Sequence, residues 1–376
     1  MSINSKIGIL GGGQLGRMLI QKAIDFDLNI SVLDPADDCS CRHICNSFTK
    51  GDFNNYDDVF NFGKNLDIIT IEIENVNTQA LKDLQKIGKQ IFPSPETIEM
   101  IKDKGLQKAF YAENNIPSSP FILCENLEEI QSKSDFLPFA QKLRTGGYDG
   151  KGVAIIKSEN NFDKLLDGAS VLEKLVDIEK EIAIIAARNQ NNEIKLFPVV
   201  ELVFNDEANL VDYLFAPANI SAEIEQQANE IAKTIIEKLH FVGLLAIEMF
   251  VDKKGNVLVN EMAPRPHNSG HHTIEANITS QYEQHLRAIL NLPLGNTETI
   301  LACAMVNVLG EKGFSGKTKI EGLNEILKID GVKPHFYGKK TTKPFRKMGH
   351  VTVLDKTVKG AIEKTEIVKN TLKIKA

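Results

Sequence analysis

The most constraining feature of this 376-residue chain is a glycine-rich turn near its N-terminus. The stretch "IGILGGGQLGRMLI", residues 7–20, places Gly11, Gly13 and Gly16 in a G-x-G-x-x-G pattern between an apolar run and a helical pattern. A second apolar run, "NISVLDP", closes with Asp34. This order is typical of a βαβ unit whose glycine turn aims backbone N–H groups at a phosphate. The pattern leaves open whether that phosphate belongs to a nicotinamide dinucleotide or to another ligand.

Composition and charge exclude several classes of protein. The chain is 42% hydrophobic and 25% charged, which is ordinary for a globular protein, and its net charge of −6 argues against a nucleic-acid partner. No run approaches the roughly 20 apolar residues of a membrane span, and the first apolar run ends too early for a secretory signal. We therefore expect a cytoplasmic protein. The segment "CSCRHIC" lacks the paired C-x2-C spacing of a zinc ribbon.

The order of apolar runs and turn signals predicts an α/β N-terminal part followed by α+β segments. Strands are expected at 7–10 and 30–33 with a helix at 14–26 between them, and "LDIITIEIENV" predicts a later strand. The prolines at 93–95 indicate a boundary, with Ser94 as the cap of the next helix. The expected domains are 1–98, 99–296 and 297–376.

A second glycine-rich loop, "TGGYDGKG", covers residues 145–152. Strand-like segments flank it, "PFAQKL" before and "VAIIK" after, which predicts a hairpin flap rather than a Walker loop opening a helix. Such a flap can approach a phosphate closely, although an ordinary flexible hairpin is the alternative. One strand later, "EKLV" at 173–176 could give an adenine ring an apolar slot and backbone hydrogen bonds, or could simply end a strand.

Two glutamates in "IEMFVDKKGNVLVNE" form the sharpest pattern in the sequence. A symmetric turn at 252–255 places Glu248 opposite Val259, with Glu261 one diagonal step away on the same face. Two such carboxylates can share one magnesium ion, which prefers oxygen ligands. The alternative is an exposed hairpin with solvated glutamates, which the apolar run around Glu248 disfavours.

Cations and polar side chains gather in further segments. Lys142 follows the apolar segment "FLPFAQ", which indicates either an anion ligand or a lysine snorkelling at a strand edge, and Lys104 is a second candidate. The segment "APRPHNSGHHT" follows the carboxylate hairpin and predicts a polar substrate loop. Its polar residues include Arg265, His267, Asn268, His271 and His272. The segment "YGKKTTKPFRKMGH" indicates an anionic ligand or a solvated basic loop. Its cations are Lys339, Lys340, Lys343, Arg346 and Lys347.

Together these segments resemble the ATP-grasp superfamily, and within it the N5-carboxyaminoimidazole ribonucleotide synthetase family of purine biosynthesis. The resemblance runs from "GILGGGQLGRML" through "ITIEIENV", "LRTGGYDGKG", "VGLLAIEMFV" and "VNEMAPRPHNSGHHT" to "FRKMGHV". It implies a Rossmann-like N-terminal domain, a central ATP-grasp domain with its flap at about 115–175, and a small β-rich C-terminal domain. It also implies a homodimer, ATP as co-substrate, and magnesium or manganese as the metal.

The resemblance further implies roles for individual residues. The family's ATP contacts match Lys104, Lys142, Gly147, Tyr148, Asp149, Gly150, Lys151, Gly152, Val153, Glu173, Lys174, Leu175, Val176, Glu181, Asn260 and Glu261. Its metal ligands match Glu248 and Glu261. The ribonucleotide contacts, carried over partly from the related glycinamide ribonucleotide formyltransferase, match Gln14, Leu15, Glu72, Asn268, Lys339, Arg346 and Lys347. The catalytic candidates are Tyr148, Arg265 and Lys347. Relatives can have Arg at position 104, and Lys there loses the bidentate fork.

The implied reaction is ATP-dependent carboxylation of 5-aminoimidazole ribonucleotide. Bicarbonate attacks the γ-phosphate to give carboxyphosphate, and the exocyclic amine captures this species or the carbon dioxide it releases. The glycine turn would then face the ribonucleotide phosphate. The rivals are the formate-dependent formyltransferase, a nicotinamide-dependent dehydrogenase and a catalytically silent nucleotide-binding subunit. Asn268 favours the carboxylase, because a neutral amide suits a neutral aromatic amine and the formyltransferase has Asp there.

Overall fold

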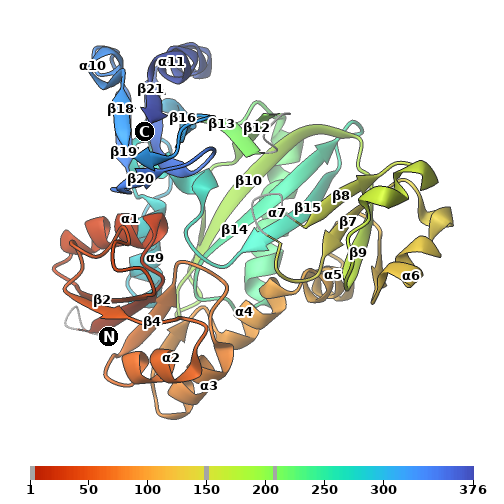
Figure 1. Ribbon diagram of the computed structural model, residues 1–376, viewed down its shortest axis with the longest axis horizontal. Helices are drawn as coiled ribbons and strands as arrows, with labels where there is room; N and C mark the ends of the chain where they lie inside the picture. Colours follow the sequence, from red (N-terminus) through yellow and green to blue (C-terminus); the bar gives the residue numbers. More distant parts are fainter. Residues whose placement is uncertain (1–4, 148–151, 206–209) are drawn as a thin grey trace.

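The computed structural model describes residues 5–147, 152–205 and 210–376 (Figure 1). Its N-terminal part is a parallel sheet in the order β3-β2-β1-β4-β5, the arrangement of a Rossmann half. The strands are β1 (Lys6–Leu10), β2 (Asn29–Asp34), β3 (Ser47–Lys50), β4 (Ile68–Ile71) and β5 (Gln90–Phe92). The helices are α1 (Gln14–Ile24), α2 (Tyr56–Gly63), α3 (Thr78–Lys86) and α4 (Pro95–Lys102). The predicted βαβ order is confirmed, and α1 ends two residues before the expected position.

Local signals explain where these elements begin. Gly11 has φ = +96°, a left-handed conformation that favours glycine, and this bend joins β1 to α1. Ser94 caps α4 as predicted, because its hydroxyl accepts a hydrogen bond from the N–H of Thr97 at 3.2 Å. Asp103 caps the next helix, α5 (Lys104–Glu113), in the same way.

The second glycine-rich loop joins two strands of a small antiparallel sheet, ordered β6-β9-β7-β8. Its strands are β6 (Phe121–Cys124), β7 (Phe139–Leu143), β8 (Val153–Ile156) and β9 (Ser170–Lys174). Lys142 pairs with Val153 across β7 and β8, which confirms the predicted hairpin. The short helices α6 (Leu127–Gln131), η1 (Ser134–Phe136) and η2 (Glu159–Lys164) complete this layer.

A large, mostly antiparallel sheet forms the centre of the molecule, ordered β15-β14-β10-β12-β13-β16-β21-β19, with β11 pairing β10. Its strands are β10 (Ile178–Arg188), β11 (Ile194–Leu196), β12 (Val200–Asn205), β13 (Leu210–Ala216), β14 (Gly243–Asp252), β15 (Val257–Ala263), β16 (Ala302–Leu309), β19 (Val332–Phe336) and β21 (Lys347–Asp355). Helix α7 (Ala222–Lys238) buries an apolar face against β10 and β14. The sheet continues from the middle of the chain into its C-terminal third through the pairing of β13 with β16.

The remaining elements lie around this sheet, and the longer helices among them pack on its strands (Figure 1). They are η3 (Asn268–Gly270), α8 (Thr273–Ala276), α9 (Gln281–Ile289), β17 (Gly316–Lys317), β18 (Lys319–Glu321), α10 (Leu323–Ile326), β20 (Thr341–Thr342), α11 (Val358–Thr371) and β22 (Lys373–Lys375). Helix α9 packs on α1, where Tyr282 and Leu286 join the same buried cluster as Met18 and Leu19. Among the described residues, no helix has the length and apolarity needed to cross a membrane.

His285 predicts a loss of folding stability in mild acid. This fully buried residue of α9 contacts the hydroxyl of Thr70 at 2.9 Å, and burial lowers its pKa to about 4. The unfolded chain, with a histidine pKa near 6.5, binds the proton first, so the free energy of unfolding falls as pH drops from about 6.5 toward 4. Between pH 7.5 and 5, the free energy of unfolding of the His285→Gln variant should therefore fall by about 2 kcal/mol less than that of the wild type, as measured by urea denaturation. His43→Gln, at an exposed position, is the control; parallel profiles for wild type and His285→Gln would contradict the prediction.

Candidate active site

The two predicted carboxylates lie directly opposite each other on the β14–β15 hairpin. The register pairs Glu248 with Glu261 and Met249 with Val259, so Asn260 is the extra residue of a β-bulge. The predicted register, with Glu248 opposite Val259, is therefore wrong. The bulge moves one residue of β15 out of the ladder and brings the two carboxylates onto facing positions.

The bulge shifts the predicted register by one residue, and the turn of this hairpin shifts it by one more. The Asp252 N–H donates to Asn256 O at 3.0 Å, so three residues rather than two separate the strands. The Asp252 carboxylate accepts from the Lys254 and Asn256 N–H groups at 2.8 and 2.9 Å, and Gly255 has φ = +80°. A three-residue loop with a left-handed glycine fits these features.

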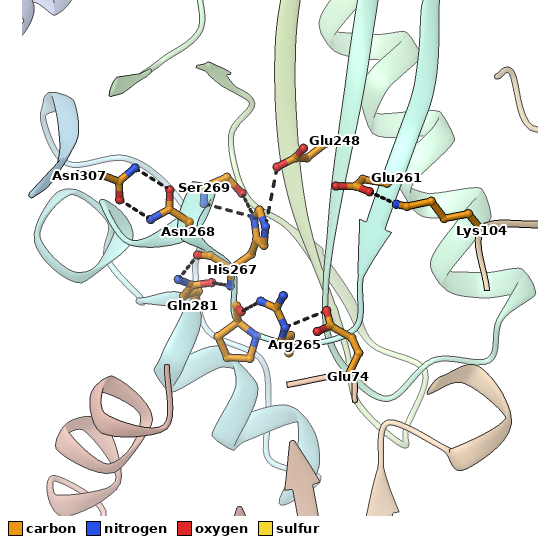
Figure 2. A network of polar contacts seen from close by, with 11 residues as sticks. Glu74, Lys104, Glu248, Glu261, Arg265, His267, Asn268, Ser269, Gln281 and Asn307 are labelled. Carbon is orange, nitrogen blue, oxygen red and sulfur yellow. Dashed lines mark hydrogen bonds and ion pairs between the residues drawn. The ribbon is translucent and has the colours of Figure 1, made fainter. Parts of the chain in front are cut away.

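Two lysines from other elements converge on the hairpin. Lys104, at the start of α5, places Nζ 2.5 Å from Glu261 Oε2 (Figure 2). Lys142 of β7 donates to Asn260 Oδ1 at 2.8 Å. The ammonium of Lys104 holds the pKa of Glu261 well below its usual range. Burial, together with the negative charges of Glu261 and Glu181, raises the pKa of Glu248. The cluster is therefore a pair of facing carboxyl groups bordered by ammonium groups, a combination that suits a metal-assisted phosphate site.

Glu173 lies between two buried ammonium groups. Its carboxylate is 3.0 Å from Nζ of both Lys108 and Lys142, and Lys108 and Glu173 are almost completely buried. Burial opposes ionisation of Glu173, but the two lysines lower its pKa overall. Sequence analysis missed Lys108. The available signal was its position one helical turn after Lys104, which places both on the same face of α5.

Five of the predicted nucleotide contacts, Lys104, Lys142, Glu173, Asn260 and Glu261, belong to this cluster. Residues 148–151, which include Tyr148, Asp149, Gly150 and Lys151, lie outside the described residues. The Lys174 ammonium turns toward the carbonyls of Phe136 and Leu137, at 2.9 and 3.1 Å, rather than toward the hairpin. Glu181 lies on β10, and burial raises its pKa to about 7 although Lys142 opposes the rise. Half-buried Leu175 and Val176 follow β9, and Gly147, Gly152 and Val153 border the glycine hairpin.

The polar loop after β15 is held in place by Gln281, at the first position of α9. The fully buried Gln281 amide accepts from the His267 N–H at 2.9 Å and donates to the His267 carbonyl at 2.8 Å (Figure 2). The His267 Nδ1 accepts from the Ser269 N–H at 3.3 Å, which leaves the proton on Nε2. That nitrogen faces Glu248 Oε1 at 3.8 Å, so the loop lies against the carboxylate pair.

Asn268, the next residue, is paired with Asn307 of β16. The Asn268 amide donates to Asn307 Oδ1 at 2.8 Å, and the Asn307 amide donates to Asn268 Oδ1 at 3.2 Å. This reciprocal amide pair joins the loop to the C-terminal third of the chain (Figure 2). Sequence analysis missed Asn307, although a lone amide in the apolar run "LACAMVNVLG" was a usable signal.

Arg265 joins the loop to the N-terminal sheet. Its Nε lies 2.8 Å from Glu74 Oε1, in the segment after β4, and its guanidinium donates to Pro266 O at 3.1 Å. This ion pair explains why "ITIEIENV" and "EMAPRPHN", far apart in the sequence, belong to one site. Sequence analysis did not single out Glu74.

The glycine turn does not present its N–H groups as predicted, because carboxylates of the chain itself accept from them. The Gly12 N–H donates to Asp34 at 2.7 Å, and the Gly13 and Gly16 N–H groups donate to Glu72, the latter at 2.7 Å. Burial raises the pKa of Glu72 although these N–H groups oppose the rise. The prediction that this turn cradles a phosphate is therefore wrong for these three N–H groups. Asp34, 8% exposed, faces inward rather than toward a dinucleotide ribose.

The basic C-terminal segment meets the start of α1. Lys339 Nζ donates to Gln14 Oε1 at 3.0 Å and to the Lys347 carbonyl at 2.6 Å, which brings these three residues together beside Leu15. Arg346 instead donates to Thr341 O at 2.7 Å within its own segment. Lys340 and Lys343 are exposed.

Three family models match consecutive segments: a ribonucleotide synthetase preATP-grasp domain at 4–102, an ATP-grasp domain at 109–282 and a phosphoribosylaminoimidazole carboxylase C-terminal domain at 303–364. The crystal structure of N5-carboxyaminoimidazole ribonucleotide synthetase from Thermotoga maritima is 44% identical, with a TM-score of 0.92 and 99% coverage of both chains. The N5-carboxyaminoimidazole ribonucleotide synthase of Staphylococcus aureus is 36% identical over 95% of both chains. The chain belongs to this synthetase family. The predicted family and fold class are thus confirmed.

Membership of the synthetase family makes the chain an ATP-dependent ligase of purine biosynthesis with ATP as co-substrate. A related structure, the synthase from Aspergillus clavatus in complex with ADP and 5-aminoimidazole ribonucleotide, is 30% identical with a TM-score of 0.89 and 99% coverage of both chains. The chain spans between 63% and 67% of the length of the fungal and plant phosphoribosylaminoimidazole carboxylases that it matches.

Proposed function

We propose that the chain carboxylates 5-aminoimidazole ribonucleotide with bicarbonate, converting ATP to ADP and phosphate and forming N5-carboxyaminoimidazole ribonucleotide. The observation that supports this most directly is the contact between the carboxylate hairpin and the substrate loop. Glu248 faces His267, and the neighbouring Asn268 presents a neutral amide. Phosphate activation and recognition of a neutral amine are thereby combined in one site.

The ATP site is proposed along the glycine hairpin and the two lysines. Lys104 and Lys142 would neutralise the phosphates, with Gly147, Gly152 and Val153 closing over them. The segment 173–176 would hold the adenine by backbone groups, and Glu181 and Asn260 would complete the site. The residues at 148–151, including Tyr148 as the group that excludes water, are part of the same proposal.

Glu248 and Glu261 fit a hard divalent cation, because they face each other across the hairpin. Magnesium takes one or two carboxylates together with phosphate oxygens, and manganese has similar preferences. When bound, such an ion would neutralise charge on the ATP phosphates. The chain's own residues supply the rest: Lys104 pairs with Glu261, and His267 directs its Nε2 proton toward Glu248.

The ribonucleotide is proposed to bind between the start of α1 and the substrate loop. Its phosphate would be bound by Gln14, Leu15, Lys339, Arg346 and Lys347. The contacts of the Lys339 ammonium with the Gln14 side chain and the Lys347 carbonyl support this, because they bring a cation to the start of α1. Glu72 would contact the ribose from beneath the glycine turn, and Asn268 would face the amine. Arg265 and Lys347 would stabilise the anionic carboxyphosphate. We further propose a homodimer, which mass photometry would check.

Release of phosphate from ATP tests the proposal directly. The wild type should release phosphate only with magnesium, 5-aminoimidazole ribonucleotide and bicarbonate together, measured by a coupled phosphate assay. Glycinamide ribonucleotide with formate should give a rate lower by on the order of 10³ or more, because its protonated amine would face a neutral amide. Efficient formylation, or reduction of NAD without ATP turnover, would overturn the assignment.

A further inference from the structure

Asn307 is a polar residue in an otherwise apolar strand of the central sheet. Its neighbours on β16, Val306 and Val308, are buried, and Asn307 itself is half-buried beside the substrate loop. A polar group at such a position costs stability unless its hydrogen bonds are satisfied. Its contacts therefore indicate why an amide is placed there.

The backbone fixes the orientation of the Asn307 amide. Nδ2 of Asn307 donates to the carbonyl of Val211 on the neighbouring β13 at 3.2 Å. A carbonyl can only accept, so the NH2 group must face it and Oδ1 must face the other way. That oxygen accepts from Asn268 Nδ2 at 2.8 Å, while the second N–H of Asn307 donates to Asn268 Oδ1.

Among the described residues, this arrangement leaves one N–H and one lone pair of the Asn268 amide without a partner. Its other donor and acceptor sites are taken by Asn307. The loop backbone does not depend on Asn307, because Gln281 holds His267 by two separate hydrogen bonds. Asn307 thus determines how the Asn268 side chain is turned, rather than where the loop lies.

We infer that Asn307 is a positioning residue that fixes the Asn268 amide so that the site accepts a neutral amine. A carboxylate at 268 would place one of its oxygens against Asn307 Oδ1. Turning the Asn307 amide over would remove that clash but would place Asn307 Oδ1 against the Val211 carbonyl. The Asn268–Asn307 pair therefore disfavours Asp at position 268. Without that carboxylate, the site lacks the negative charge that a protonated aliphatic amine needs. This inference rests on the proposed function.

The test compares two substitutions of Asn307. Asn307→Ala removes the partner, whereas Asn307→Asp keeps its shape but cannot donate to Val211 or Asn268. Both should raise the KM for 5-aminoimidazole ribonucleotide about tenfold, the loss of roughly one hydrogen bond, and leave the KM for ATP within about twofold. A packing role predicts instead that Asp is harmless. Asn189→Ala is the control, because it removes a buried amide at the distant β10–β11 turn and should change neither KM.

A double-mutant cycle with Asn268→Asp separates this role from general destabilisation. If Asn307 Oδ1 opposes a carboxylate at 268, removing Asn307 should partly relieve the effect of Asn268→Asp. The kcat/KM of the Asn268→Asp/Asn307→Ala variant, relative to wild type, should then be about fivefold or more higher than the product of the relative values of the two single variants. Additive effects, or an unchanged ribonucleotide KM in both Asn307 variants, would overturn the inference while the wild type remains active. A wild type without ribonucleotide-dependent phosphate release would instead refute the proposed function.

Discussion

Glu261→Gln should abolish turnover while the fold remains intact. The substitution keeps the shape of the side chain but removes the charge that faces Glu248 and pairs with Lys104 at 2.5 Å. If Glu261 is a magnesium ligand, losing it removes several kcal/mol of transition-state stabilisation, and kcat/KM should fall by about a thousandfold or more. The measurement is phosphate release at saturating substrates over a series of magnesium concentrations, with thermal denaturation to confirm folding.

The matched control is Glu237→Gln on α7, where the side chain is half exposed and lies 4.0 Å from Lys233. An exposed pair of this kind contributes little, so both the rate and the stability of this variant should match the wild type. A Glu261→Gln variant with a near-normal rate at saturating magnesium would show that Glu261 is not a ligand.

The features that sequence alone predicted depend on local patterns. The alternation of apolar runs and glycine turns predicted the parallel β1-α1-β2 unit, because the periodicity of apolar residues in a strand or helix is visible within a short stretch of sequence. The β7–β8 hairpin followed equally from strand-like segments on both sides of the second glycine loop. The two glutamates of the carboxylate hairpin also stood out, since charges in an apolar run need partners.

The features that sequence missed depend on contacts between distant segments. The facing of Glu248 and Glu261 required a bulge at Asn260, and a one-residue slip in register has no local signature in that run. Glu74, Gln281 and Asn307 gain their roles only when other parts of the chain pack beside Arg265, His267 and Asn268. Pattern reasoning could name many of the chemically active side chains, but not the partners that hold them in place.

The glycine turn shows most clearly how tertiary structure overrides a motif. The G-x-G-x-x-G pattern correctly predicted a bend and a helix start, but Glu72 and Asp34 provide the carboxylates to which its N–H groups donate. A helix N-terminus attracts negative charge from any source. The identity of that anion therefore cannot be predicted from the turn and must come from the neighbouring strands.

Glu173→Gln should destabilise the protein by about 3–5 kcal/mol, the usual cost of removing one partner from a buried ion cluster. The change leaves the ammonium groups of Lys108 and Lys142 facing each other without the carboxylate that separates them at 3.0 Å from each. Repulsion should also displace Lys142 from Asn260, so the KM for ATP should rise. Urea denaturation and steady-state kinetics measure the two effects.

A second substitution distinguishes this ionic role from a direct contact with the ATP ribose. Lys108→Met in the Glu173→Gln background leaves Lys142 as the charged residue among positions 108, 142 and 173. The net charge of the cluster then equals that of the wild type. If Glu173 acts by separating two lysines, this double variant should regain at least about half of the lost stability. If Glu173 is instead a ribose ligand, Glu173→Gln should leave stability nearly unchanged, and Lys108→Met should not recover the KM for ATP. Because Lys108 is almost completely buried beneath Glu173, the ionic role is the one we expect.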